Sequence, residues 1–434
     1  MFAFYIIMCY TVFIRQHMER RRFMNTTPLI FHIDVNSAYL SWTAVHELEL
    51  GRTEDIRLVP SAIGGNRETR HGVILAKSPS AKACGIRTGE PVVTALKKCP
   101  SLQLFPPDFE LYDKNSRAFL SILRTYSPHV EPFSIDEAFM DMSGTELLYG
   151  SSLNAAKQIR DQIFSELGFT VNIGIAENRL LAKMASDFEK PGKIHTLFPP
   201  EIRTKMWPLP VTDLFMVGRS AAETLHALGI HTIGELASSN PATLRAHLKK
   251  QGEILWKYAN GQDDGLFDRD TKDREIGNST TLPDDIDSSD AAKKILLALC
   301  ETVCTRLRHQ NLRAACVSVQ ITDCNFVRRS HQKALPVLTN ITGELYSAVC
   351  ALFDELWNGT PIRLLGVQTS KTASESYRQF SLFDSGKAEK LEKLDSCVDE
   401  IRKKFGDDSI KRASFLNGQT RHMIGKQTGA KKHD

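Results

Sequence analysis

The chain has 434 residues, 42% of them hydrophobic and 24% charged, and its formal net charge is +4. These proportions are those of an ordinary soluble globular protein with about two to four domains and no membrane partner. A net charge of +4 is compatible with nucleic-acid binding but is not by itself an argument for it. The nine Cys form no C-x-x-C pair, so there is no disulfide or zinc pattern, and we expect a cytoplasmic protein.

The first 22 residues are an apolar, aromatic run (1–14) followed by a basic one (15–22). A signal peptide or membrane anchor is one reading of this pattern. However, the apolar run is too short to span a bilayer comfortably and lacks both a basic stretch before it and a small-residue cleavage site after it. We therefore interpret residues 1–27 as an N-terminal extension with a non-native start, and we expect the working protein to begin near Met24.

The first element expected in the core is a strand over residues 29–35, whose apolar run leads into Asp34. A helix over residues 37–50 follows, with apolar side chains at helical spacing and Gly51 as its stop. Residues 56–107 have the pattern of a small α/β segment. A second long helix is predicted over residues 109–126.

Two adjacent carboxylates, Asp136 and Glu137, lie between short apolar runs. This pattern predicts a strand, a tight turn that carries the acids, and a second strand. By itself, a pair of acids at a hairpin turn is most often an ordinary surface feature. Adjacent acids repel each other and are costly to bury without a partner, so a buried pair needs a strong cation.

A helix over residues 153–167 and a strand over residues 169–175 complete a β-α-β-β-α-β order once the insertion over 37–107 is set aside. That order predicts a ferredoxin-like sheet. In this topology Asp34, at the end of the first strand, approaches Asp136 and Glu137, at the turn between the second and third. Three carboxylates without His or Cys at ligand spacing suit Mg²⁺ rather than zinc.

The second half of the chain begins with a compact helical stretch over residues 202–260 and a polar, Gly-containing linker. A second β-α-β-β-α-β pattern then runs over residues 276–369. Its middle part is rich in basic residues that suit DNA phosphates, although scattered solubilising charge is a serious alternative. These residues are Arg306, Arg308, Arg313, Arg328, Arg329 and Lys333.

The last segment contains a short apolar stretch and then an amphipathic pattern. Gln379, Leu382 and Phe383 stand out from polar flanks. Apolar residues then recur at spacings of three and four within 391–405, which predicts a helix that packs back on the protein or binds a partner.

Several of these motifs resemble the Y-family DNA polymerases, the translesion group. The resemblance rests on Asp34, an aromatic residue five positions later (Tyr39), and Ser134-Ile135-Asp136-Glu137-Ala138, and it extends over residues 28–370. It implies an α+β fold of the right-hand polymerase type. The expected domains are a ferredoxin-like palm (28–37 and 106–192), small fingers (38–105), a helix-hairpin-helix thumb (193–262), a linker (263–276), a second ferredoxin-like domain called the little finger (277–370), and a tail (371–434).

The resemblance also implies an active site. Asp34 and Asp136 would bridge two Mg²⁺ ions, Glu137 would complete one of the two metal sites, and Val35 would lend its backbone carbonyl. Two metals of this kind lie roughly 3.5–4 Å apart and clamp the attacking and leaving oxygens of a phosphoryl transfer. Tyr39 takes the place of the aromatic residue that clashes with a ribose 2′-OH.

Two lysines, Lys82 and Lys183, hold the places of residues that contact the nucleotide triphosphate. Where the family commonly has Tyr and Arg, this chain has Pro79 and Lys82, so the bidentate contact of Arg is lost. A hydroxyl from Ser78 or Ser80 is one possible substitute.

Contacts with DNA and with a sliding clamp are implied as well. Gly218 belongs to half of a helix-hairpin-helix element, in which the family's first glycine is replaced by Met216. Such hairpins bind DNA phosphates through backbone N–H groups. Arg328 and Arg329 are further candidate DNA contacts. Gln379, Leu382 and Phe383, within residues 379–383, resemble the motif that docks bacterial polymerases on the sliding clamp, the beta subunit.

The function implied is template-directed, low-fidelity synthesis past damaged bases by a monomer that uses primer-template DNA, dNTP and two Mg²⁺ ions, without proofreading. One alternative is a non-catalytic protein with this fold that binds DNA and the clamp. Another is a nucleotide cyclase, which shares a similar sheet and metal chemistry but needs neither a helix-hairpin-helix nor a clamp motif.

Overall fold

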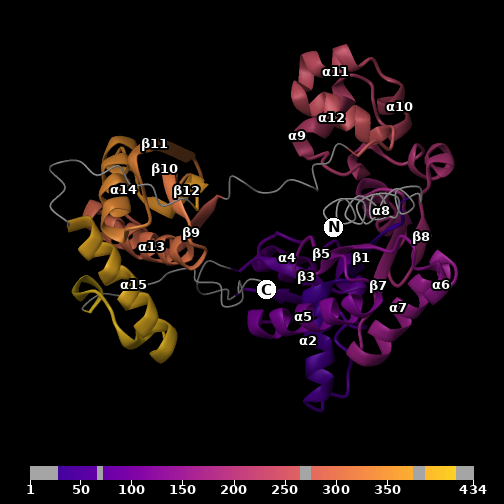
Figure 1. Ribbon diagram of the computed structural model, residues 1–434, viewed down its shortest axis with the longest axis horizontal. Helices are drawn as coiled ribbons and strands as arrows, with labels where there is room; N and C mark the ends of the chain where they lie inside the picture. The colour runs from indigo at the N-terminus through magenta and orange to yellow at the C-terminus, as the bar shows by residue number, and fades with distance from the viewer. Residues whose placement is uncertain (1–27, 66–71, 264–274, 375–386, 417–434) are drawn as a thin grey trace, which may run out of the picture. The chain divides into compact units, whose positions relative to one another are not determined.

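The computed structural model describes residues 28–65, 72–263, 275–374 and 387–416 (Figure 1). They divide into two compact units, the first from residues 1–65 and 73–268 and the second from 66–72 and 269–434. The N-terminal extension and the three predicted clamp-binding residues, Gln379, Leu382 and Phe383, lie outside the described residues. Within those ranges, no helix is long and apolar enough to cross a membrane.

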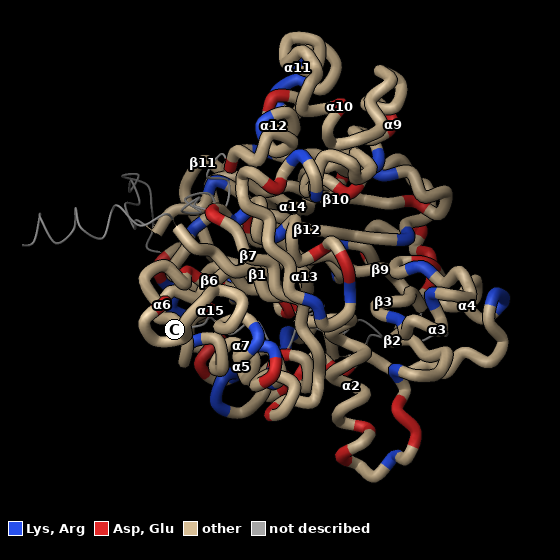
Figure 2. The backbone as a smooth tube through the Cα atoms, turned by 90° about the vertical axis from the view of Figure 1, so that its right-hand side faces the viewer, with Lys and Arg blue, Asp and Glu red and all other residues tan. Residues whose placement is uncertain are grey.

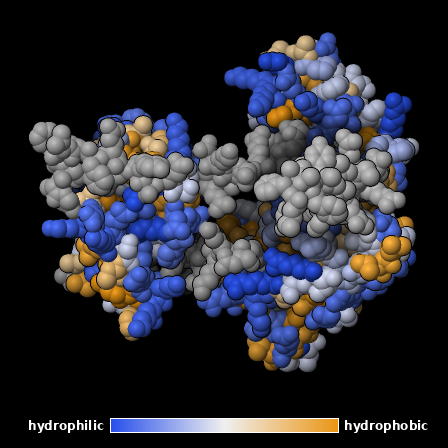
Figure 3. Space-filling view, viewed as in Figure 1, coloured by the Kyte–Doolittle hydropathy of each residue, from blue (hydrophilic) through white to orange (hydrophobic). Residues whose placement is uncertain are grey.

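Apolar side chains gather in separate cores inside the two units. Figure 2 shows Lys and Arg interspersed with Asp and Glu along the backbone. The two kinds of charge are nearly equal in number, which gives the small net charge of +4. Among the residues coloured in Figure 3, hydrophilic ones predominate in this view, and the hydrophobic patches are separate from one another. Scattered exposed apolar residues of this kind are normal for a globular protein.

The first unit is built around a five-stranded sheet, here called the central sheet, with strand order β5-β6-β1-β7-β8. Its strands are β1 (Ile30–Val35), β5 (Val130–Pro132), β6 (Glu137–Asp141), β7 (Val171–Ala176) and β8 (Ile194–Thr196). β1 is antiparallel to both β6 and β7, and β8 is added parallel to β7. The predicted ferredoxin-like order is therefore confirmed, because β1 lies between the third and fourth strands of the pattern.

Alternation along β1 sends its side chains to two different faces. Phe31, Ile33 and Val35 are buried in the core on one face, where three helices cover the sheet. These helices are α2 (Ala38–Glu49), α5 (Phe109–Tyr126) and α7 (Ser152–Leu167), and the short α6 (Glu146–Tyr149) precedes α7. His32 and Asp34 point to the opposite face, which is covered by α8 (Arg179–Ser186).

Gly174 of β7 allows α8 to lie very close to the sheet. A Cβ atom at this position would lie 1.9 Å from the carbonyl oxygen of Ala182 and 2.5 Å from the backbone nitrogen of Ser186. Because real Cβ atoms never approach backbone so closely, only glycine fits here. This close approach brings the side chains of α8 within reach of the ends of β1 and β6.

A smaller three-stranded sheet, with strand order β3-β2-β4, is inserted after α2, as predicted for this segment. Its elements are β2 (Ser61–Gly64), β3 (Ile74–Lys77), α3 (Pro79–Ala83), α4 (Val92–Lys98) and β4 (Gln103–Phe105). Pro79 occupies the first turn of α3, where a missing N–H costs nothing. The hydroxyl of the buried Ser78 caps the helix at Ala81 N and donates to Val59 O at 2.7 Å.

The rest of the first unit is helical, as the sequence predicts for residues 202–260. Its helices are α9 (Arg219–Ala227), α10 (Ile233–Ser238), α11 (Pro241–Leu248) and α12 (Lys250–Ala259), with short turns at Pro199–Glu201, Ile202–Met206 and Val211–Asp213. Met216 precedes α9 with a φ of +71°, in the left-handed region that favours glycine. This conformation gives a physical reason for a glycine at that position.

The second unit repeats the element order of the central sheet. Its elements are β9 (Ile276–Ile286), α13 (Ser289–His309), β10 (Arg313–Asp323), β11 (Arg328–Thr339), α14 (Thr342–Leu356) and β12 (Ile362–Ala373). The strand order is β11-β10-β12-β9, so the first strand of this pattern lies at the edge rather than in the middle. The two sheets thus share the order of their elements but not that of their strands.

The predicted C-terminal helix exists as α15 (Lys387–Phe405), followed by short turns at Asp407–Ser409 and Ala413–Phe415. The sequence predicts that this helix packs back on the protein or binds a partner. Leu394 and Phe405 are exposed, whereas Asp395, Asp399 and Arg402 are buried. Charged groups therefore form much of the contact between α15 and α13.

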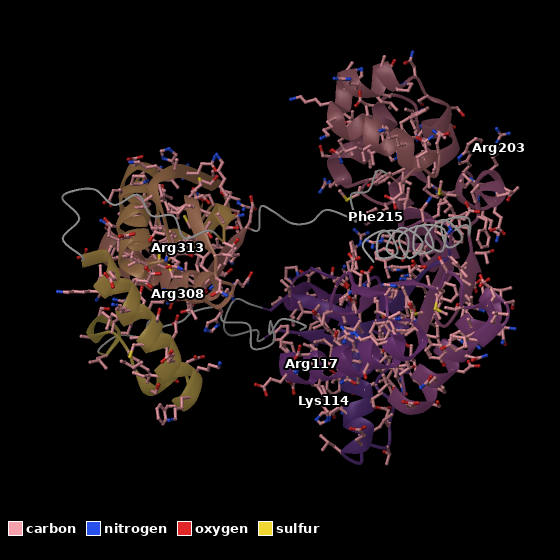
Figure 4. The ribbon with its side chains drawn as sticks, in the orientation of Figure 1. Lys114, Arg117, Arg203, Phe215, Arg308 and Arg313 are labelled. Carbon is pink, nitrogen blue, oxygen red and sulfur yellow. The ribbon has the colours of Figure 1, made fainter. Side chains whose placement is uncertain are left out.

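Arg308 of α13 and Arg313 of β10 (labelled in Figure 4), two of the basic residues considered for DNA contact, pair instead with acidic residues of α15. Arg308 Nε lies 2.6 Å from Asp399 Oδ2 and its Nη1 lies 3.3 Å from Asp395 Oδ2, while Arg313 pairs with Glu392. Since the Arg308 side chain is only 10% exposed and its two partners 9% and 8%, water screens this network weakly.

Replacing Arg308 with Ala is expected to destabilise the second unit by about 3–5 kcal/mol, because buried Asp399 loses its charged partner and buried Asp395 keeps only Arg412, 3.6 Å away. Equilibrium unfolding in urea measures this loss of unfolding free energy, with limited proteolysis of α15 as the readout. Lys393→Ala, which removes an exposed pair with Glu389 on the same helix, is the control and is expected to leave the urea midpoint unchanged. A loss below about 1 kcal/mol for Arg308→Ala would mean that α15 docks by other contacts.

Candidate active site

The three carboxylates predicted from the sequence meet at one end of β1 and β6. Asp34 and Glu137 are direct partners across the two antiparallel strands, and the Val35 N–H donates to the Asp136 carbonyl oxygen at 3.0 Å. Glu137 begins β6, while Asp136 lies in the preceding turn. The structure therefore brings together the residues that the topology predicted would be close.

Glu137 is held by two side chains on the same oxygen. Its Oε2 accepts from His32 Nε2 at 3.0 Å and from Lys183 Nζ. Burial alone raises the pKa of this carboxyl, but the hydrogen bonds and positive charge of these partners outweigh burial and lower the pKa of Glu137 to about 2. Glu137 is therefore an ionised acceptor at neutral pH.

Asp34 is more deeply buried, at 9% exposure, and its Oδ2 pairs with Lys190 Nζ. Lys190 also pairs with Asp187 at 2.8 Å. Burial raises the pKa of Asp34 to about 6, since the attraction of Lys190 only partly offsets burial and the repulsion of Glu137 and Asp136. Lys190 thus compensates the burial and charge of Asp34 less completely than His32 and Lys183 compensate those of Glu137.

Asp136 is partly exposed, and its Oδ1 accepts from the Ser134 hydroxyl at 2.5 Å. Tyr39 lies close enough that the charge of Asp136 adds to burial in raising the pKa of the Tyr39 hydroxyl. The Tyr39 ring stacks on Tyr112, with centroids 4.5 Å apart and 13° between the planes. Stacking on a buried ring fixes the position of Tyr39 beside the carboxylates.

The two predicted triphosphate lysines lie in different surroundings. Lys183 Nζ is 5.0 Å from the ring centre of Phe133 and 5.5 Å from that of Phe215 (labelled in Figure 4), both at cation–π distance. Lys82 is exposed at the end of α3. Ser78 cannot replace the missing Tyr contact, because its buried hydroxyl is used in capping α3. Ser80 is half-buried and donates to Leu58 O at 3.2 Å.

A divalent cation fits this donor set. Among the described residues, no three His, Cys, Asp or Glu side chains are already gathered as a metal site. Instead, the ammonium groups of Lys183 and Lys190 lie on the carboxylates that a hard cation would bind. Carboxylate oxygens are preferred Mg²⁺ ligands, so the residues present at this end of β1 and β6 fit a hard divalent cation.

The candidate DNA contacts are found at separate places. Gly218 directly precedes α9, where the helix N-terminus begins. Arg328 lines a polar groove of about 1030 Å³ on the sheet of the second unit, together with Arg306, Gln320 and Gln368. Arg329 points elsewhere, since its Nη1 lies 3.3 Å from Asp323 Oδ2, as neighbours on a strand face opposite ways.

Sequence reasoning missed His32, Ser186, Asp187 and Lys190, which all contact the carboxylates or their partners. Alternation along β1 could have indicated His32, because it shares a face with Asp34. No simple signal indicates the other three, since their place depends on how closely α8 packs against β7.

Comparison with protein families gives three matches along the chain. The impB/mucB/samB family matches residues 33–187, the HHH motif of the IMS family matches residues 199–230, and the impB/mucB/samB C-terminal domain matches residues 273–382. The first match contains Asp34, Tyr39, Asp136, Glu137 and Lys183.

Relatives are similar over nearly their whole length. DNA polymerase IV of Clostridium acetobutylicum is 47% identical over 391 residues, covering 90% of this chain and 98% of the relative. DNA polymerase IV 1 of Bacillus subtilis is 35% identical over 395 residues, covering 89% and 93%.

Among solved structures, a Y-family DNA polymerase chimera has the same fold. Its TM-score is 0.67 at 20% identity, and the match covers 79% of this chain and 98% of the chimera. The palm-like sheet, the helix-hairpin-helix match and the second α/β unit agree with that fold. This chain therefore belongs to the impB/mucB/samB family, the Y-family DNA polymerases.

Proposed function

We propose that this translesion DNA polymerase adds deoxynucleotides to a primer 3′-OH at the carboxylate cluster of Asp34, Asp136 and Glu137. The observation that carries the proposal is the pairing of Asp34 with Glu137 across β1 and β6, which places all three acids at one strand end. Synthesis there is of low fidelity and proceeds without proofreading.

Two Mg²⁺ ions held by these carboxylates and by the Val35 carbonyl would activate the primer 3′-OH and offset charge on the leaving pyrophosphate. Asp34, Asp136 and Glu137 would supply the carboxylate ligands, with Asp34 and Asp136 expected to serve both ions and Glu137 one of them. Release of Lys190 from Asp34 and of Lys183 from Glu137 would free two ammonium groups beside the carboxylates. These groups are then available to neutralise the triphosphate, a role to which the exposed Lys82 contributes.

Tyr39 is proposed to select the sugar. Its ring is fixed by stacking on Tyr112 and lies beside Asp136, where the nucleotide sugar must pass. A ribose 2′-OH would meet the ring, whereas a deoxyribose has only hydrogen there. Discrimination of this kind comes from steric exclusion at a rigid wall rather than from a hydrogen bond.

The remaining assignments follow the family. We propose a palm over residues 28–37 and 106–192, fingers over 38–105, a thumb over 193–262, a linker over 263–276, a little finger over 277–370, and a tail over 371–434.

Gly218 and Arg328 are the proposed contacts to primer-template DNA, and Arg329 is a weaker candidate because it pairs with Asp323. Gln379, Leu382 and Phe383 are proposed to dock on the sliding clamp of a cytoplasmic, monomeric enzyme.

Replacing either Lys183 or Lys190 with Gln is expected to raise the KM for dNTP about tenfold to a hundredfold, because a charge-assisted contact to the triphosphate is lost. Steady-state single-nucleotide insertion measures this change, with DNA affinity measured separately. Lys193→Gln is the matched control, since Lys193 is half exposed and pairs only loosely with Glu189, at 3.6 Å. Unchanged KM in both variants would remove these lysines from the nucleotide site.

A further inference from the structure

His32 lies at the back of the carboxylate cluster, two residues before Asp34 on β1. Its side chain is 1% exposed and has a polar partner on each ring nitrogen. Nε2 lies 3.0 Å from Glu137 Oε2, and Nδ1 lies 2.7 Å from the hydroxyl oxygen of Ser186 on α8. The ring also packs against Phe139, with centroids 4.7 Å apart, so it has little freedom to turn.

The hydrogen bonds determine which nitrogen carries the proton. Ionised Glu137 can only accept, so Nε2 must carry a hydrogen. The Ser186 hydroxyl lies within hydrogen-bond distance of both His32 Nδ1, at 2.7 Å, and the Lys183 carbonyl oxygen, to which it can donate at 2.8 Å, so it holds the ring from the side away from Glu137.

We propose that His32, oriented by Ser186, is a positioning residue that holds the Glu137 carboxylate in the orientation needed to bind a divalent cation. The inference rests on the proposed function, in which Glu137 is a metal ligand. His32 and Lys183 both meet Oε2, so Oε1 is the oxygen that neither holds. A partner behind a metal ligand that fixes its orientation is a general feature of metal sites.

The two partners of Glu137 differ in how readily they leave. Lys183 has a long, flexible side chain that can move to an incoming triphosphate. His32 is enclosed by Ser186 and Phe139 and stays in place. When Lys183 moves away, the hydrogen bond from His32 keeps the Glu137 carboxylate from rotating. The carboxylate therefore keeps the same orientation toward the cation while the nucleotide binds.

The test measures Mn²⁺ binding, as a stand-in for Mg²⁺, by electron paramagnetic resonance of the full chain with dideoxy-terminated primer-template and dNTP. His32→Phe keeps a ring but removes both hydrogen bonds, and it is expected to raise the Mn²⁺ Kd about tenfold or more. His32→Gln, whose amide can donate to Glu137, is expected to restore most of the affinity. Ser186→Ala, which leaves the ring in place, is expected to weaken binding by a few fold.

A double-mutant cycle separates positioning from general damage to the fold. If His32 acts through Glu137, His32→Phe has no further effect on Mn²⁺ binding in a Glu137→Gln background. Native Mn²⁺ affinity in both His32→Phe and Ser186→Ala, or fully additive losses in the cycle, would overturn the inference. If Glu137→Gln alone leaves Mn²⁺ binding unchanged, the proposed metal site itself fails, and the inference with it.

Discussion

Replacing Asp136 with Asn is expected to lower the single-turnover rate of primer extension by at least about a thousandfold. Asn keeps the size of the side chain and can keep the contact with Ser134, which lies 2.5 Å from Oδ1. It removes the negative charge that two cations would share. Since that charge is needed when the phosphoryl group is transferred, the loss should appear in the chemical step rather than in DNA binding.

The matched control for this variant is Asp141→Asn. Asp141 lies on the same strand, β6, but at its far end, where it is exposed and caps Ser143 N at 2.9 Å. The control is expected to extend primers at the native rate, and both variants should bind primer-template DNA as the native chain does. An Asp136→Asn enzyme within tenfold of the native rate would show that the metal site lies elsewhere.

Replacing Tyr39 with Ala is expected to raise ribonucleotide incorporation, relative to deoxyribonucleotide incorporation, by roughly a hundredfold. The change removes the ring that stacks on Tyr112 beside Asp136 and opens space for a 2′-OH. Deoxynucleotide insertion should fall much less, because the carboxylates are untouched. The ratio of kcat/KM for ribonucleotide and deoxyribonucleotide insertion opposite the same template base measures the effect.

Tyr39→Phe distinguishes a steric wall from a hydrogen-bonding one. Phe keeps the ring and its stacking, so a steric gate predicts native discrimination. Loss of discrimination in Tyr39→Phe would mean that the hydroxyl recognises the sugar, and unchanged discrimination in Tyr39→Ala would place the gate at another residue.

The sequence predicts the central sheet and its acids because both depend on backbone topology. The β-α-β-β-α-β order puts β1 beside β6, and that pairing alone places Asp34 opposite Glu137. The stop at Gly51 and the helical periodicity likewise predict α2 within one residue at each end. Local sequence signals of this kind predict the final structure well where tertiary packing favours the same element.

Other parts of the site depend on contacts between distant segments, and the sequence does not show them. Lys190 reaches Asp34 across 156 positions, and Ser186 reaches His32 across 154, because Gly174 lets α8 lie so close to β7. From the sequence, Arg308 looks like a DNA-binding arginine, but in the structure it pairs with the buried Asp395 and Asp399 of α15. A charged residue's partner is set by tertiary packing, so composition alone cannot tell a phosphate contact from an internal ion pair.

Whether the native chain extends a primer at all tests the proposed polymerase activity most directly. The measurement is primer extension by the full chain on undamaged and lesion-containing templates, with all four dNTPs, across a titration of Mg²⁺. We expect extension that requires Mg²⁺ and passes the lesion, and we expect no shortening of the primer when dNTPs are withheld. DNA binding without extension at any Mg²⁺ concentration would contradict the proposed activity and leave a non-catalytic DNA- and clamp-binding protein.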